Sequence, residues 1–303
     1  MKTCAIIYNP ICGKKTFHHT LPNVESRLET LGYTCNIYKT EYANHATALV
    51  KKALDESKPE LLIVAGGDGT FNEVLNGLMA CESKPTVGYI PTGTSCDLGS
   101  SLGIKKDIDQ AMEIIEEHTV VRMDVGLSTF GYFSYVCASG SYIDISYETP
   151  TIFKKLFGYL AYVFSGIKRF FKLKKYYMVV KSEHGEQKGL YTLAMVLNSK
   201  RVASMNVVNR PVLDDGKLDV ALFKYTPFLN NMLFFISFIL HPYKVPRVKR
   251  FKTAIIEFEA PDQAIWNQDG EKKGKGSIKI EVVKQALPII INKNQLKYFQ
   301  NQK

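Results

Sequence analysis

The sequence predicts an α/β domain with a parallel sheet, followed by a mainly β sandwich domain. In the first 125 residues, short apolar runs alternate with helical patterns. After that point strand-like segments follow one another, with one long helical stretch among them. The chain of 303 residues is also long for a single hydrophobic core, so we expect two domains.

The first part of the chain reads as strands that alternate with helices. The predicted strands are Cys4–Tyr8, Thr34–Tyr38, Leu61–Ala65 and Val87–Ile90. The predicted helices are Leu21–Leu31, Ala46–Leu54 and Val74–Met79. Such alternation is typical of a parallel sheet with helices on both faces, and these sheets bind ligands outside the carboxyl ends of their strands.

The second part reads as mainly β. Its predicted strands are Tyr132–Ala138, Tyr176–Lys181, Tyr191–Leu197, Leu218–Phe223, Thr253–Phe258 and Ser277–Val283. The long helical stretch runs from Phe153 to about Lys172. We therefore expect an α/β domain over residues 1–125 and a β-sandwich domain over 126–289. The tail, 290–303, is expected to pack back on the first domain.

Charge and composition limit the classes of partner and compartment. The formal net charge of +10 favours an anionic partner: nucleic acid, an acidic membrane surface or a phosphate-rich substrate. The six cysteines form no C-x-x-C pair, which disfavours a zinc site and a disulfide framework. The N-terminal apolar run is too short for a signal peptide, and no run approaches the roughly 20 apolar residues of a spanning helix. We therefore expect a cytoplasmic protein.

A glycine-rich loop follows the third predicted strand. Gly66-Gly67-Asp68-Gly69-Thr70 leads into a helix, and glycines there let the backbone approach a phosphate while helix N–H groups favour an anion. Thr70 and Glu73 have the spacing of a capping box. Asp68 would repel phosphate unless Mg²⁺ lies between them. The alternative reading of this loop alone is a structural turn.

A second loop of the same kind follows the next strand. Pro91–Asp97 supplies the Gly93-Thr94 pair and a further carboxylate, Asp97. Because consecutive parallel strands end at the same edge of a sheet, two such loops together indicate a phosphate site more strongly than either one alone.

Together with motifs elsewhere, these loops resemble the diacylglycerol kinase catalytic-domain family, which includes bacterial lipid kinases and the eukaryotic sphingosine and ceramide kinases. The resemblance covers nearly the whole chain. The matching segments are Asn9-Pro10, Gly13-Lys14, Thr40, His45-Ala46, Gly66–Thr70, Asn72-Glu73-Val74, Asn76-Gly77-Leu78, Pro91, Gly93, Thr94, Asp97, Arg122, Asp124, Gly126, Asn198, Asp214–Val220 and Asp269-Gly270-Glu271.

The resemblance implies a Mg²⁺-dependent kinase that transfers the γ-phosphate of ATP to a lipid hydroxyl, such as that of diacylglycerol. It implies Glu271 as the general base, Asp68 as a second catalytic residue, and Asp68, Asp97 and Asp215 as the metal network. The implied nucleotide contacts are Asn9, Pro10, Ile11, Cys12, Gly13, Thr40, Gly66, Gly67, Asp68, Gly69, Thr70, Phe71, Asn72 and Thr94.

The sequence departs from the family pattern in two places. Cys96 stands where members typically have asparagine, next to Asp97. The segment Val202-Ala203-Ser204-Met205 replaces a glycine-rich stretch after Asn198. We expect the second change to reshape the lipid-facing side of the cleft, so the sequence does not identify the lipid.

A basic and aromatic segment runs from Lys154 to Lys175, with seven basic residues and no acidic one. It is typical of a helix that lies in the plane of an anionic bilayer, with Lys168, Arg169 and Lys172 as membrane contacts. The alternative is a helix packed on the sandwich with a solvated basic end. No nucleic-acid-binding motif accompanies it. We expect a protein peripheral to the inner membrane face; a homodimer is compatible with the sequence.

Two other functions stay open. NAD kinases and phosphofructokinases share a Gly-Gly-Asp-Gly loop, so a soluble acceptor such as NAD is one alternative. The Asn72–Val74 and Asp269–Glu271 motifs favour the lipid branch. The other alternative is a non-catalytic regulator that binds nucleotide or lipid, against which Asp68, Asp215 and Glu271 all argue by being present.

Overall fold

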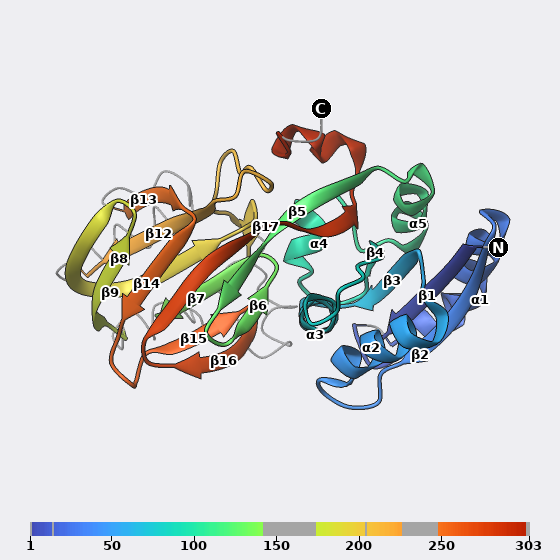
Figure 1. The fold of residues 1–303 in the computed structure, drawn as a ribbon, viewed down its shortest axis with the longest axis horizontal. Coiled ribbons are helices and arrows are strands. Elements are labelled where there is room, and N and C mark those ends of the chain that lie inside the picture. Colours follow the sequence, from blue (N-terminus) through green and yellow to red (C-terminus); the bar gives the residue numbers. More distant parts are fainter. Residues whose placement is uncertain (1, 14, 142–173, 204, 226–247, 301–303) are drawn as a thin grey trace, which may run out of the picture.

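A computed structural model of the chain describes residues 2–13, 15–141, 174–203, 205–225 and 248–300. An α/β region carries the N-terminus and a β-rich region lies beside it (Figure 1). Two long strands, β5 (Val120–Ser128) and β17 (Ile278–Ile290), run between the two regions. The predicted order of an α/β part followed by a mainly β part is confirmed.

The α/β region is built on a parallel sheet in the spatial order β4-β3-β1-β2. These strands are β1 (Lys2–Tyr8), β2 (Tyr33–Lys39), β3 (Leu61–Gly66) and β4 (Thr86–Pro91). Every residue of β3 is buried, as its unbroken apolar run predicts for a central parallel strand. The carboxyl ends of the four strands therefore share one edge.

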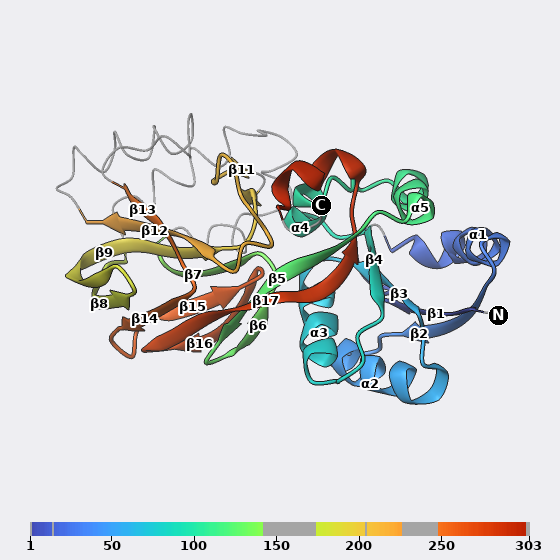
Figure 2. The same ribbon diagram turned by 45° about the horizontal axis from the view of Figure 1, so that its top comes forward.

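Helices cover both faces of this sheet (Figure 2). They are α1 (Phe17–Thr30), α2 (His45–Ser57), α3 (Asp68–Met79), α4 (Asp97–Ser101) and α5 (Ile108–Glu117). α2 packs closely on α3 at Gly77, where an added Cβ would lie 2.9 Å from the Thr47 carbonyl oxygen. This packing fixes the direction of α3, whose first residues form the glycine loop.

The β-rich region is antiparallel and encloses its own core. Its strands are β6 (Gly131–Phe133), β7 (Val136–Gly140), β8 (Tyr176–Ser182), β9 (Gly185–Leu197), β12 (Leu218–Lys224), β13 (Val248–Thr253), β14 (Ile255–Glu259), β15 (Ile265–Gln268) and β16 (Glu271–Lys275). A small hairpin joins β10 (Arg201–Val202) and β11 (Met205–Asn206). Trp266 is fully buried against Phe258, with ring centroids 5.0 Å apart.

The last part of the chain returns to the α/β region. β17 pairs with β5 along most of its length and with β4 at Ile289. Beyond it, the Asn292 N–H donates to the Leu102 carbonyl oxygen at 3.1 Å. A 3₁₀ helix, Lys293–Tyr298, follows. The α/β region is therefore made of two separate stretches of sequence, with the β-rich region inserted between them.

Three predicted strands differ in extent from the observed ones. Tyr132–Ala138 divides into β6 and β7, because the backbone between them turns around a buried carboxylate described below. Thr253–Phe258 spans the end of β13 and all but the last residue of β14. The strand predicted at Ser277–Val283 continues to Ile290 past an irregularity in the pairing. The helix predicted from Phe153 lies outside the described residues.

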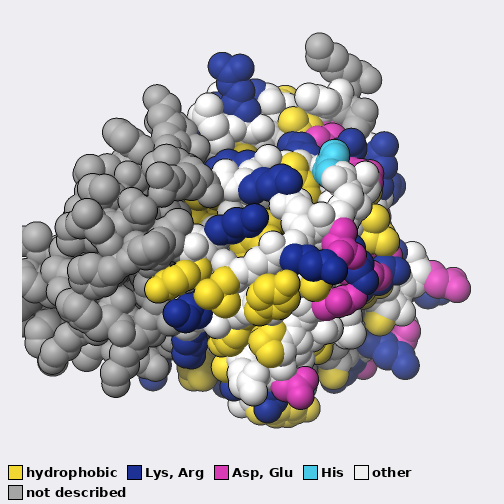
Figure 3. Space-filling view, turned by 90° about the vertical axis from the view of Figure 1, so that its left-hand side faces the viewer, with side chains coloured by type: hydrophobic (Ala, Val, Ile, Leu, Met, Phe, Trp, Pro, Cys, Tyr) yellow, Lys and Arg dark blue, Asp and Glu magenta, His cyan; other side chains and the backbone are white. Residues whose placement is uncertain are grey.

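The surface of the β-rich region mixes two kinds of side chain. Its outer end shows hydrophobic and basic side chains on one face (Figure 3). Exposed hydrophobic residues of this region include Tyr177 of β8 and Ile255 of β14. Within the described ranges, no helix is both long and apolar enough to cross a membrane.

Candidate active site

Three loops meet at the carboxyl ends of β1, β3 and β4. The Asn9 N–H donates to the Ala65 carbonyl oxygen at 3.0 Å, and the Thr92 N–H donates to the Gly66 carbonyl oxygen at 2.9 Å. Gly13 has a φ of +56°, and a Cβ added there would lie 1.9 Å from the Thr92 carbonyl oxygen. The opening loop can therefore approach the loop after β4 only with glycine at this position.

The two predicted phosphate loops are in direct contact. A Cβ added to Gly93 would lie 2.6 Å from the Gly67 Cα, and one added to Gly67 would lie 3.4 Å from Cys12 Sγ. Among the described residues, Thr92 Oγ1 is a buried hydroxyl oxygen without a hydrogen-bond partner at this junction. The residues that the sequence assigns to phosphate binding are thus brought together by backbone contacts.

The capping box predicted from Thr70 and Glu73 is wrong. Helix α3 begins two residues earlier, at Asp68, with Gly67 as its N-cap in an extended conformation. Thr70 therefore lies inside the first turn, where its hydroxyl oxygen accepts a hydrogen bond from Asn9 Nδ2 at 3.2 Å. The first N–H groups of a helix have no partner within it, so the start of α3 still offers donors to an anion.

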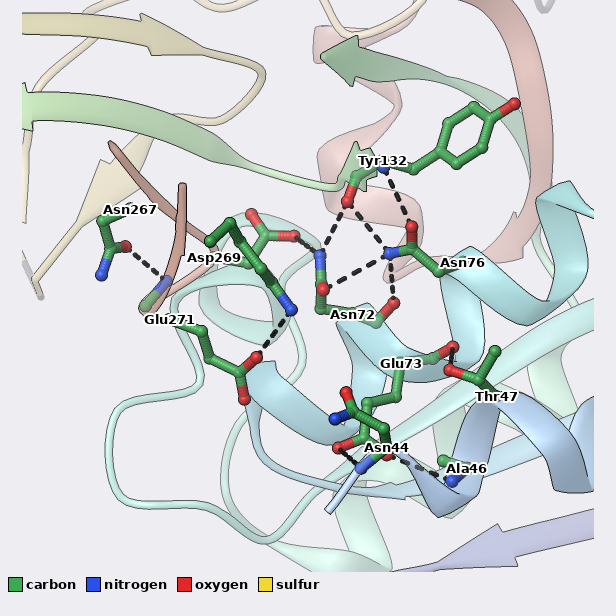
Figure 4. A network of polar contacts seen from close by, with 12 residues as sticks. Asn44, Ala46, Thr47, Asn72, Glu73, Asn76, Tyr132, Asn267, Asp269 and Glu271 are labelled. Carbon is green, nitrogen blue, oxygen red and sulfur yellow. Dashed lines mark hydrogen bonds and ion pairs between the residues drawn. The ribbon is translucent and has the colours of Figure 1, made fainter. Parts of the chain in front are cut away.

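Glu73 serves a neighbouring helix instead. Its carboxylate accepts hydrogen bonds from the Asn44 N–H at 2.9 Å and the Ala46 N–H at 3.1 Å (Figure 4). Both donors lie at the start of α2, where a negative charge is stabilised by the helix dipole. Glu73 therefore joins α2 to α3.

Asp68 holds the start of α4. Its carboxylate accepts hydrogen bonds from the Asp97 N–H at 3.1 Å and the Leu98 N–H at 3.4 Å. The pKa of Asp68 is raised to about 7, chiefly by burial and also by the nearby carboxylates of Asp97 and Asp269, while the Asp97 and Leu98 N–H groups act in the opposite direction. The described protein groups therefore leave the negative charge of Asp68 incompletely compensated.

Asp97 contacts the segment that lacks the family's glycines. Its Oδ2 accepts a hydrogen bond from the Ala203 N–H at 2.5 Å. Ala203 has a φ of +50°, a region that glycine adopts more readily than alanine. The β10–β11 hairpin is thereby attached to the loop after β4.

Asp269 is the buried link between the two regions. Its Oδ2 accepts hydrogen bonds from the Ser134 N–H at 2.6 Å, Ser134 Oγ at 2.8 Å and Asn72 Nδ2 at 3.0 Å. Its Oδ1 accepts from the N–H groups of Tyr135 and Val136 at 2.9 and 3.1 Å. Burial raises the pKa of Asp269, and these donors oppose the rise. Asn72 comes from α3, so Asp269 attaches the β15–β16 turn to the helix of the glycine loop (Figure 4).

Glu271 follows Asp269 by two residues, and its side chain lies beside the start of α3. A Cβ added to Gly69 would lie 2.6 Å from Glu271 Oε1, so the carboxylate touches the glycine loop. Its other oxygen accepts a hydrogen bond from Lys273 Nζ at 2.8 Å. The Glu271 side chain is 41% exposed and can be reached from solvent.

Asp215 is the third carboxylate predicted for the metal network, with Asp68 and Asp97. Among the described residues, no group of three or more His, Cys, Asp or Glu side chains is placed to hold a metal ion. Asp215 Oδ2 forms an ion pair with Lys252 Nζ at 2.6 Å. The sequence could not reveal this pairing, because Lys252 belongs to β13 and lies 37 residues further along the chain.

The remaining predicted nucleotide contacts differ in their accessibility. Phe71 packs in the core against Tyr89, with ring centroids 5.0 Å apart, and the Asn72 side chain is fully buried. Neither residue therefore exposes surface to a ligand in this structure. Ile11 is exposed at the opening loop, Thr94 is exposed in the second loop, and the Thr40 N–H donates to the Tyr8 carbonyl oxygen. The predicted membrane contacts Lys168, Arg169 and Lys172 lie outside the described residues.

Sequence reasoning missed the structural roles of Asp269 and Glu73 and the presence of Lys273 and Lys106 at the site. Lys106 Nζ donates to the Thr94 carbonyl oxygen at 2.6 Å. The available signal for Asp269 was the Asp269-Gly270 pair, which is typical of a turn. No sequence signal marked the two lysines within so basic a chain.

Known proteins resemble this chain over most of its length. The family model of the diacylglycerol kinase catalytic domain matches residues 3–128. A diacylglycerol kinase of Staphylococcus saprophyticus is 32% identical over 277 residues, with 90% of each chain covered. One from Staphylococcus haemolyticus is 32% identical over 279 residues, covering 91% of this chain and 84% of the relative.

Solved structures show the same fold. The crystal structure of a putative diacylglycerol kinase from Bacillus anthracis superposes with a TM-score of 0.82 at 24% identity, covering 97% of this chain and 96% of that one. Identity to the staphylococcal relatives over nearly their full length establishes the family as well. The chain belongs to the diacylglycerol kinase family of lipid kinases.

Proposed function

We propose that the protein transfers the γ-phosphate of ATP to a hydroxyl group of a membrane lipid such as diacylglycerol. One observation carries the proposal: the Glu271 carboxylate touches Gly69 at the start of α3. A candidate base from the β-rich region is thereby held at the candidate phosphate loop. The names of the relatives support diacylglycerol as the acceptor.

The loop junction suits a polyphosphate. Gly13, Gly67 and Gly93 bring the backbones of two loops and a helix start into contact, and a helix start favours anions. Thr92 Oγ1, buried and without a partner among the described residues, is a hydroxyl that a phosphate or a water bound there would satisfy. The residues present therefore fit a nucleotide phosphate chain.

Asp68 fits a magnesium ion that is shared with the nucleotide. Mg²⁺ is usually held by one or two carboxylates together with phosphate oxygens and water, so a full cage of protein ligands is not required. The raised pKa of Asp68, caused by burial and by neighbouring carboxylates, is the property that a cation would relieve. When bound, Mg²⁺ would neutralise phosphate charge during transfer.

Glu271 is the group suited to take the proton of the acceptor hydroxyl. It is accessible from solvent, and it lies on a hairpin that Asp269 attaches to α3. A base must come within hydrogen-bond reach of the hydroxyl while that oxygen faces the phosphorus. The attachment through Asp269 sets this position in the protein before the lipid binds.

The test is a labelled-phosphate transfer assay from ATP, with diacylglycerol in mixed micelles and NAD as the soluble acceptor. Glu271→Gln is expected to lower kcat for the lipid by about a hundredfold or more while nucleotide affinity stays near the wild-type value. Glu257→Gln, a change at an exposed residue of β14, is the matched control.

Phosphate transfer to NAD without transfer to the lipid would refute the lipid acceptor. Full turnover by Glu271→Gln would refute the role of Glu271 as the base. Transfer that is unaffected by EDTA would refute the role of Mg²⁺.

A further inference from the structure

Lys273 lies at the candidate active site, although no sequence motif includes it. Its Nζ is 2.8 Å from Glu271 Oε2, and the other oxygen of that carboxylate touches Gly69. The Lys273 side chain is 21% exposed, compared with 41% for Glu271. The Lys273 side chain is therefore more enclosed than the acid that it contacts. The Glu271 carboxylate contacts both the ammonium group and the phosphate loop.

The backbone directs Lys273 to this place through a β-bulge. Trp266 pairs with Gly274, and the next residue of β15, Asn267, pairs with Lys272. Lys273 is therefore the extra residue of β16. A bulge of this kind re-aims side chains that regular alternation would point elsewhere, and bulges are frequent beside active sites.

The hairpin that carries Lys273 is fixed on both sides. Asp269 ties its turn to Asn72 of α3, and Asn267 Oδ1 accepts a hydrogen bond from the Gly270 N–H at 3.1 Å (Figure 4). Beyond the bulge, Gly274 lies against Phe130, whose ring would be 2.4 Å from an added Cβ. A lysine on such a support is positioned with little freedom of the backbone.

The charges around the site indicate that the pair of Lys273 and Glu271 does more than stabilise the fold. A partly exposed ion pair contributes little to stability, so stability gives little reason for this geometry. The site already holds the carboxylates of Asp68, Asp97 and Asp269 near one another. A bound nucleotide adds more negative charge, and phosphoryl transfer needs cationic groups on the transferring phosphate.

We propose that Lys273 is a catalytic residue that contacts an oxygen of the transferring phosphoryl group. In the free protein its ammonium pairs with Glu271, and with ATP bound it pairs with the phosphoryl oxygen, which frees Glu271 for the acceptor. During transfer the acceptor oxygen forms a bond to phosphorus, the bond to the bridging oxygen of ATP breaks with its electron pair left on ADP, and the hydroxyl proton passes to Glu271. Lys273 supplies charge and no proton. This inference rests on the proposed kinase function.

The experiment compares Lys273→Met and Lys273→Arg with the wild type in the full chain. We expect Lys273→Met to lower kcat for ATP-dependent lipid phosphorylation by about a hundredfold with KM for ATP changed less than about threefold. Lys273→Arg, which keeps the charge, should recover turnover to within about tenfold of the wild type. Lys275→Met, an exposed lysine on the same strand, is the matched control and should match the wild type.

Direct binding of ADP keeps the test decisive if Lys273→Met is poorly folded. ADP lacks the γ-phosphate, so a folded variant should bind it with wild-type affinity. Wild-type kcat in Lys273→Met would overturn the inference, as would a rise in KM for ATP alone, and so would failure of Lys273→Arg to recover turnover. A wild-type protein that transfers no phosphate to lipid would instead refute the proposed function.

Discussion

Replacing Asp269 by asparagine should weaken the attachment between the α/β region and the β-rich region, because Asp269 is the buried residue that links them. The carboxylate is 1% exposed and accepts three hydrogen bonds at Oδ2 and two at Oδ1. An asparagine oxygen in the Oδ1 position keeps the Tyr135 and Val136 donors. Its NH₂ group in the Oδ2 position then faces the Ser134 N–H and Asn72 Nδ2, which are donors as well.

The magnitude follows from those two mismatches. A buried donor that loses its partner costs about 1–3 kcal/mol, so two of them cost about 2–6 kcal/mol. Burial disfavours the ionised form of Asp269, as its raised pKa indicates, so removal of the charge offsets part of this loss. We expect Asp269→Asn to lower the free energy of unfolding by about 2–4 kcal/mol.

The assay is urea unfolding followed by circular dichroism, with transfer kinetics on the same samples. Because Glu271 follows Asp269 by two residues, a small displacement of the turn should also lower kcat by about tenfold or more. Asp262→Asn, a change at an exposed residue of the same region, is the control. An unfolding free energy within about 0.5 kcal/mol of the wild type, together with unchanged kcat, would show that Asp269 does not link the regions in this way.

Three further changes test other parts of the structure. Gly13→Ala places a Cβ 1.9 Å from the Thr92 carbonyl oxygen and should raise KM for ATP by about tenfold, whereas Gly32→Ala, also at positive φ but in open space, should not. Burial raises the pKa of Asp219 to about 6, so the folded protein binds this proton more tightly than the unfolded chain does. As the pH rises from about 4 to 6, the free energy of unfolding should therefore fall by roughly 1–3 kcal/mol. Asp219→Asn should flatten this pH dependence in urea unfolding, and an unchanged slope would contradict the prediction. Glu73→Gln weakens two charge-assisted hydrogen bonds at the start of α2 and should lower the free energy of unfolding by about 1 kcal/mol, measured by thermal unfolding. An unchanged free energy of unfolding would contradict this role of Glu73.

The apolar pattern predicted strands well where burial is uniform. Leu61–Ala65 was predicted within one residue of the observed β3, because every residue of that strand is buried. β17 was predicted only in its first half. Its pairing with β5 becomes irregular after Val283, and Gln285 there has a φ of +50°, with its N–H donated to Asp124. A local pattern ends at such a break, although the strand continues beyond it.

The sequence located the loops of the candidate site but not the side-chain contacts between distant parts of the chain. Glycines and strand ends are local signals, so Gly66–Thr70 and the Pro91–Asp97 loop could be located from the sequence. The hydrogen bonds of Asp269 reach Asn72 and Ser134, and the ion pair of Asp215 reaches Lys252. Such partners are far apart in the chain, and only the fold shows which of them meet. The expectation that Asp215 joins Asp68 and Asp97 therefore had no local signal to test it.

The insertion of the β-rich region has a consequence for synthesis on the ribosome. Ile289 pairs with Val87 of β4, so the neighbour of that sheet edge is translated about 200 residues, or roughly 10–40 s, after the edge itself. During this interval the nascent sheet presents an unpaired edge, which other chains can join. Strands β1 to β4 of the α/β region are translated before the β-rich region, and β17 is translated after it. Chaperone dependence of the yield should therefore be set by how quickly β17 reaches β4.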